Sequence, residues 1–209
     1  AFEQAGSSLT FIADQQTDLH IFGIELPPSS IQNANSFFII FLAFPFSWLW
    51  MKLQKRNLEP NSPTKQSIGL LLLSIGYLII AFRVKDLGTE KMNVIWLILM
   101  YLFHTMGELC LSPIGLSLVS KLAPKRFSSL LMGVWFLANA AGYALSGTLG
   151  ALLPPQKINS STIFPSFAGF QIHNLYEFFM VFVILSGVAA IALYLLSIGP
   201  LKRMMHGIR

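Results

Sequence analysis

The sequence predicts an all-α membrane protein, and three observations support this class. Of the 209 residues, 54% are hydrophobic and only 11% are charged, whereas soluble domains carry about 25% charged residues. The apolar residues gather in six runs, each followed by Pro, Gly or charged residues that indicate a break. The basic residues form short clusters between these runs, which is typical of cytoplasmic membrane loops and not of a nucleic-acid surface.

The first run, about residues 1–13, is too short to span a bilayer, which requires about 20 residues. Because the chain opens without Met and without a basic leader, we expect this run to be the end of a truncated helix. The other five runs cover about residues 30–53, 65–82, 92–120, 127–153 and 174–201. Residues 1–209 are therefore expected to form one six-helix transmembrane bundle.

The distribution of Lys and Arg predicts the orientation. Ten of the fourteen follow the second run, the fourth run or the last run, and four lie on the opposite side. By the positive-inside rule, the side with ten faces the cytoplasm, together with the C-terminus. The ten are Lys52, Lys55, Arg56, Lys65, Lys121, Lys125, Arg126, Lys202, Arg203 and Arg209.

The third and fifth runs differ in composition. The third is mostly Leu, Ile and Gly, which favours an outer helix facing lipid. The fifth carries Ala138, Gly142 and Ser146 at four-residue spacing on one face. Small residues let membrane helices approach closely, so we expect the fifth run to be an inner helix.

One carboxylate, Glu108, lies within the fourth run. A charge at the centre of a membrane helix costs roughly 3 kcal/mol and usually has a function. Pro113 removes a backbone donor, and Ser112 can bond back to the preceding turn, so these two predict a helix break. A carboxylate beside such a break is typical of a transporter binding site. His104, one turn earlier, either tunes Glu108 or is an interhelical histidine.

Other classes of site find no support in the sequence. It contains no nucleotide-binding loop, no cluster of zinc ligands and no nucleophile–base pair in a plausible site. The single cysteine, Cys110, excludes an internal disulfide and a cysteine-rich metal site. We therefore expect neither an enzyme nor a cofactor nor a metal.

Several stretches, in one order, resemble the proton-dependent oligopeptide transporter family of the major facilitator superfamily. They are 2–8 (FEQAGSS), 31–38 (IQNANSFF), 107–116 (GELCLSPIGL), 122–127 (LAPKRF) and 132–136 (MGVWF). The resemblance implies two six-helix halves that rock around a central cavity and import di- and tripeptides with protons. This chain resembles the C-terminal half, helices seven to twelve. Its implied partners are small peptides, protons, the bilayer and the missing N-terminal half, which would carry the helix-one glutamate motif and the helix-four lysine.

The resemblance also implies roles for individual residues. Glu108 resembles the helix-ten glutamate, which meets the amino terminus of the peptide or pairs with the helix-four lysine. Asn35 resembles the helix-eight asparagine that bonds the peptide backbone, and Asn33 is its competitor. Trp135 resembles the helix-eleven tryptophan of a side-chain pocket, and Asn139 follows one turn later on the same face.

Glu3 and Gln4 lie where the family has an acidic residue of an extracellular gate, and the sequence leaves open which of the two serves. The outer loop 84–91 is short, which favours a bacterial-type member in the inner membrane. Two alternatives remain: a transporter of another small solute, such as nitrate or an amino-acid derivative, and a non-transporting membrane subunit.

Overall fold

The computed structural model describes residues 3–4, 8–21, 24–85, 87, 91–155, 164–199 and 201. The helices in this part of the chain are α1 (Ser8–Gln16), α2 (Asn33–Lys55), α3 (Ser62–Lys85), α4 (Ile95–Leu122), α5 (Ser128–Gly150) and α6 (Leu175–Ile198). Five of them, α2 to α6, are long and apolar enough to cross a membrane. The all-α membrane class is confirmed, and α1, which overlaps the first run, is a helix of nine residues.

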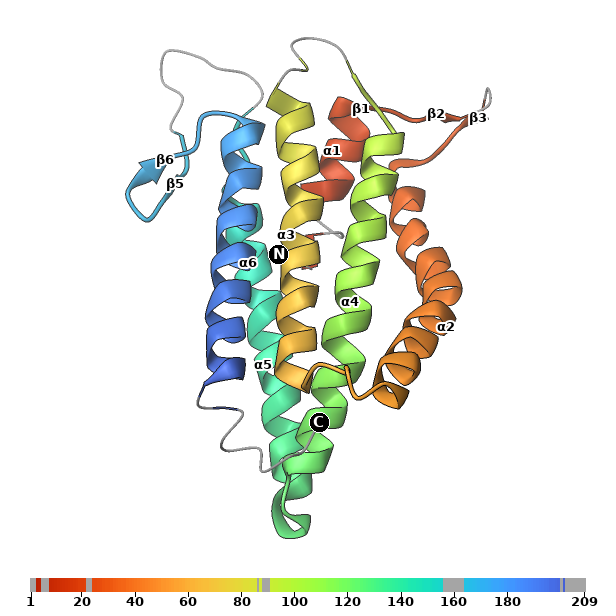
Figure 1. Cartoon of the computed structure of the whole chain (residues 1–209). Helices are drawn as coiled ribbons and strands as arrows, with labels where there is room; N and C mark the ends of the chain where they lie inside the picture. Colours follow the sequence, from red (N-terminus) through yellow and green to blue (C-terminus); the bar gives the residue numbers. More distant parts are fainter. Residues whose placement is uncertain are drawn as a thin grey trace.

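Three short strand pairs at one end of the bundle were not predicted (Figure 1). Strand β1 (Thr17–Asp18) pairs in parallel with β4 (Met92–Asn93), which joins the end of α1 to the start of α4. Strand β2 (His20–Ile21) pairs with β3 (Ile24–Glu25), and β5 (Ser166–Phe167) pairs with β6 (Phe170–Gln171). Two-residue strands leave no alternating pattern, so the sequence offers no signal for them.

Helix α3 lies between α4 and α6, and α2 stands on the outer flank and bows away from α4 (Figure 1). Pro45 lies inside α2, where its missing N–H favours such a bend. The α2–α3 and α4–α5 connections lie at the end opposite the strands (Figure 1). The basic residues of these connections therefore gather at one end, as the charge pattern predicts. The charge count also includes Lys157, Lys202, Arg203 and Arg209, and these four lie outside the described residues.

Helix α3 is packed between α4 and α6, yet a stripe that includes Leu71 and Phe82 is exposed, so the prediction that the third run faces lipid stays a prediction for that stripe. Leu73 and Tyr77 are buried in the core. A Cβ built at Gly69 would lie 2.7 Å from the Gly107 carbonyl oxygen on α4. On the other side, Ser67 donates a hydrogen bond to the Ala190 carbonyl of α6 at 2.7 Å. Leu, Gly and Ser suit a helix contact in a membrane as well as a lipid-facing surface, so composition alone did not separate the two.

The small-residue face of α5 is largely open within the described chain. Ser146 is buried, but Ala138 and Gly142 are exposed. A Cβ built at Gly142 would meet nothing within 4 Å among the described residues. The interpretation of α5 as an inner helix therefore stays a prediction about what lies beyond this chain.

Candidate functional site

The structure joins Glu108 to Asn35 across the α2–α4 contact. The Asn35 amide donates from Nδ2 to Glu108 Oε2 at 3.1 Å. The hydroxyl of Thr105, one turn before Glu108, lies within hydrogen-bond reach of both Asn35 Oδ1 and the Tyr101 carbonyl oxygen. Asn35 is thus held at both ends of its amide, whereas Asn33 is exposed. Of the two asparagines, Asn35 is the one that faces the carboxylate.

Glu108 has no cationic partner among the residues that the structure describes. The ion pairs found there join His20 to Asp18, Lys65 to Glu59 and His173 to Glu177, and none includes Glu108. Within the same residues, Asn35 is the one side chain that donates to this carboxylate. A carboxylate at membrane depth requires a counter-charge or further donors, so Glu108 has capacity for a cationic group.

The neighbouring contact between α3 and α4 orients Glu108. Gly107 is pressed against α3, since a Cβ there would lie 2.8 Å from the Gly69 carbonyl oxygen. Successive helix residues point about 100° apart, and Glu108 is directed toward α2. His104 is buried, and its ring lies 4.8 Å from that of Tyr77 on α3 in an edge-on contact. His104 therefore packs against α3, in line with the interhelical interpretation, and a role in tuning Glu108 stays a prediction.

The N-terminal segment distinguishes Glu3 from Gln4. Gln4 is 0% exposed, and its Nε2 donates to the Ser146 carbonyl oxygen at 2.8 Å and to Ser146 Oγ at 3.1 Å. Glu3 is partly exposed and lies near the Tyr143 side chain and within electrostatic reach of Glu108. Gln4 is therefore hydrogen-bonded to α5 through Ser146. Glu3 is the residue that lies within reach of the Glu108 carboxylate.

Trp135 and Asn139 lie apart from the Asn35–Glu108 pair. The Trp135 ring covers Gly115 of α4, where a Cβ would lie only 2.3 Å from Trp135 Cη2. Gly115 is seven residues beyond Glu108, about 10 Å along the helix. Asn139 is exposed, and its Nδ2 donates to the carbonyl oxygen of Trp135 on its own helix at 3.0 Å.

The predicted break at Ser112 and Pro113 is not an interruption of the helix. Pro113 lies inside α4, which continues to Leu122. Proline removes one backbone donor from a long helix, and the neighbouring bonds suffice to keep it continuous. Ser112 and Pro113 are both exposed. A bend at this point, and a hydrogen bond from Ser112 to the preceding turn, stay predictions.

A second polar cluster lies toward the basic end of the molecule, beside a cavity of about 450 Å³ between α2 and α4. Lys65 Nζ lies 2.5 Å from Glu59 Oε1, and their side chains are 8% and 13% exposed. The same ammonium lies 5.0 Å from the ring centre of Trp50. These charges compensate each other, in contrast to Glu108. The described residues contain no group of His, Cys, Asp or Glu suited to a metal ion.

Sequence reasoning missed three contributors to the site. Thr105 is three residues before Glu108 on the same helix face, so helical spacing is the signal that identifies it. Gly107, beside Glu108, and Gly69 form a small-residue pair that only a helix contact explains. Tyr143 meets Glu3 from α5, and no local pattern predicts that meeting.

Five apolar helices and a polar site at membrane depth define an integral membrane protein. A family model described as the POT family matches residues 1–163. The chain belongs to this family, a family of transporters.

Known proteins match the chain over part of their own length. It is 41% identical over 150 residues to the uncharacterized transporter YclF of Bacillus subtilis, covering 72% of this chain and 30% of that protein. It is 39% identical over 153 residues to the peptide transporter YePEPT of Yersinia enterocolitica, again 72% of this chain and 30% of that protein.

Solved structures match the chain over almost all of its length. The crystal structure of peptide transporter POT in complex with sulfate is similar with a TM-score of 0.74 and 34% identity, covering 96% of this chain and 36% of that one. The crystal structure of a POT family transporter in complex with 5-aminolevulinic acid is similar with a TM-score of 0.78 and 29% identity. The match covers 94% of this chain and 37% of that one. The chain thus spans about a third of the length of these relatives.

Proposed function

We propose that this chain is the C-terminal half, helices seven to twelve, of a proton-coupled symporter that imports di- and tripeptides by alternating access. The observation that carries the proposal is the Glu108 carboxylate, bonded by Asn35 and without a cationic partner among the described residues. A relative named as a peptide transporter at 39% identity supports the substrate class.

The contacts suggest how one half of the site holds a peptide. All peptides share an ammonium group, a carboxylate and a backbone. Glu108 would receive the ammonium through charge-assisted hydrogen bonds, which are about twice as strong as neutral ones. Asn35, already oriented by Thr105, would offer its amide to the backbone. The groups that bind the peptide carboxylate would come from the missing half.

Trp135 suits a side-chain pocket at the far end of such a peptide. Its ring covers Gly115, about 10 Å along α4 from Glu108. Three extended residues span about 10 Å, so the spacing fits a tripeptide. Asn139, exposed one turn from Trp135, would supply a further amide there.

The remaining polar residues suit gating and orientation. Glu3, which lies near Tyr143 and Glu108, would pair with an arginine of the missing half when the outer side closes. Gln4 would keep that segment attached to α5 through Ser146. The gathering of basic residues at the end with the α2–α3 connection supports a cytoplasmic C-terminus, in a bacterial inner membrane.

Uptake of a labelled dipeptide by the full-length protein in proteoliposomes tests the proposal. With an inward proton gradient, Glu108→Gln is expected to lower uptake by at least about tenfold, since a hydrogen bond to a charged group contributes about 1.5–3 kcal/mol. Asp18→Asn is the control, because Asp18 is an exposed carboxylate at the end of strand β1, away from Glu108. If Glu108→Gln takes up the dipeptide as fast as the parent protein does, Glu108 has no role in binding or coupling. If uptake by the parent is the same with and without the proton gradient, transport is not coupled to protons.

An amino-acid derivative is the second candidate substrate, because one structural relative is in complex with 5-aminolevulinic acid. That compound also carries an ammonium group for Glu108 and a carboxylate for the missing half. Competition decides between the two. If 5-aminolevulinic acid blocks uptake of the labelled dipeptide at concentrations where unlabelled dipeptides do not, the second candidate substrate replaces the first.

A further inference from the structure

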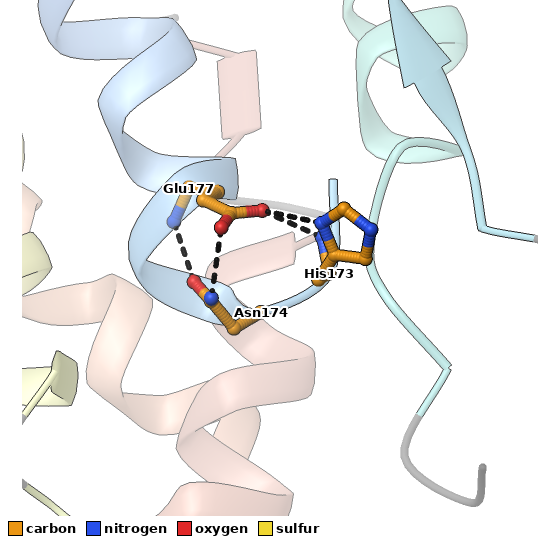
Figure 2. Close-up of polar contacts among 3 residues, drawn as sticks. All are labelled: His173, Asn174 and Glu177. Atoms are coloured by element: carbon orange, nitrogen blue, oxygen red, sulfur yellow. Dashed lines mark hydrogen bonds and ion pairs between the residues drawn. The ribbon is translucent and has the colours of Figure 1, made fainter. Parts of the chain in front are cut away.

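Hydrogen bonds among His173, Asn174 and Glu177 cap the first turn of α6 (Figure 2). The Glu177 backbone N–H donates to Asn174 Oδ1 at 2.9 Å, and Asn174 Nδ2 donates to Glu177 Oε1 at 3.1 Å. The His173 backbone N–H donates to the other carboxylate oxygen, Oε2, at 2.7 Å. This reciprocal cap fixes the start of α6 and the chain that enters it from strand β6.

The β5–β6 hairpin that precedes this cap presents an aromatic tip. Ala168 and Gly169 both have positive φ, 51° and 87°, as a tight two-residue hairpin turn requires. The turn places Phe167 directly opposite Phe170, so the two rings share one face. Phe170 is 77% exposed. Such an aromatic tip is favourable where it meets the interface of a bilayer.

A groove of about 920 Å³ separates this hairpin from the first turns of α6. The opposite side of α6 packs on α3, where Phe182 stacks on Tyr77 with ring centres 5.1 Å apart. The groove therefore opens away from the bundle, beside a helix apolar enough to span the membrane, and lipid is the medium there. Its apolar walls include Phe167, Phe170, Tyr176, Val181, Ile184 and Leu185.

The depth of the groove matches one leaflet. From Tyr176 to Leu185, α6 rises about 14 Å, close to half of the ~30 Å hydrocarbon core. At the same end of the bundle, pairs of basic and aromatic side chains indicate the interface between the bilayer and water. Lys85 Nζ lies 5.3 Å from the ring centre of Tyr176. Arg83 likewise lies 5.7 Å from the ring centre of Trp96. Paired aromatic and basic side chains are typical of the headgroup level.

We infer that this groove is a lipid site that seats one acyl chain of a bilayer phospholipid. The chain descends between the hairpin and α6, with Phe167 and Phe170 as its outer wall and Leu185 at its lower end. The phosphate lies at the level of Lys85. The hairpin is thereby an interfacial anchor as well as one side of the site.

Native mass spectrometry of the full-length protein, purified from vesicles of phosphatidylcholine and phosphatidylglycerol, tests the inference. Ile184→Trp fills the groove. Ile191→Trp is the matched control, because Ile191 lies two turns further along α6, is similarly exposed (62% against 57%) and does not line the groove. Parent and control are expected to retain a phospholipid, and Ile184→Trp is expected to retain about tenfold less, since each buried methylene favours binding several-fold. Equal retention by the two variants, or none by the parent, overturns the inference.

A cross-linking experiment in the same vesicles identifies the occupant. A photoreactive benzoylphenylalanine replaces Phe170 in one variant and Ser166 in the other, and Ser166 is an exposed residue of the same hairpin outside the groove. A phospholipid adduct at position 170 in clear excess over position 166 supports the site. Adducts with peptide or with a second copy of the protein, or equal lipid adducts at both positions, overturn it.

Discussion

Gly107→Ala tests the contact that orients the candidate site. A Cβ at position 107 would lie 2.8 Å from the Gly69 carbonyl oxygen, whereas ordinary contact begins at 3.4 Å. Helices α3 and α4 must then separate by about 0.6 Å, and because the obstacle is backbone, no side chain can rotate away. Overpacking of this kind costs about 1–3 kcal/mol, and we expect the upper end, partly offset by about 1 kcal/mol of gained helix propensity. The net expected loss is about 2 kcal/mol.

Gly133→Ala is the matched control for this prediction. It makes the same chemical change on α5, where a Cβ would meet nothing within 4 Å among the described residues. The propensity gain is common to both variants, so their difference in the free energy of unfolding isolates the clash, at about 3 kcal/mol. The assay is unfolding of the purified full-length protein in mixed micelles with increasing denaturing detergent. If Gly107→Ala is as stable as Gly133→Ala, the α3–α4 contact does not have the proposed geometry.

Three further predictions concern stability in the same assay. Gln4→Ala removes both hydrogen bonds to Ser146 and is expected to cost about 1–3 kcal/mol; no loss would contradict the attachment of the N-terminal segment to α5. Lys65→Met leaves the mostly buried Glu59 without its partner and is expected to cost about 3 kcal/mol, and adding Glu59→Gln should restore most of it; a double variant no better than the single one would contradict the ion pair. Asn174→Ala removes the cap of α6 and is expected to cost about 1 kcal/mol, measurable as earlier hydrogen exchange in its first turn; unchanged exchange would contradict the cap.

The sequence predicted the helices because each apolar run is long and bounded by breaks, and each run overlaps a helix of the structure. It did not predict the neighbours of each helix. The third run shows the reason: Gly69 and Leu73 are equally suited to lipid and to another helix, and only the fold places them against α4. The same ambiguity hid the contact between Gly69 and Gly107.

The candidate site was predicted in parts. The cost of an intramembrane charge identifies Glu108 from the sequence alone, and the family resemblance pointed to Asn35. Their hydrogen bond joins residues far apart in the chain, so no local pattern predicts it. Likewise, adjacent residues such as Glu3 and Gln4 point to different sides, and the tertiary contacts of Gln4 with α5 decide which one is buried.

The central claim is that Glu108, oriented by Asn35, receives the amino group of the substrate. Its most direct test is the affinity of the full-length protein for a dipeptide and for the same dipeptide with an acetylated amino terminus, measured by titration calorimetry. We expect the parent to bind the free amine at least about tenfold more tightly, as a hydrogen-bonded charge would, and Glu108→Gln to bind both peptides equally. A preference that is unchanged in Glu108→Gln would contradict the account.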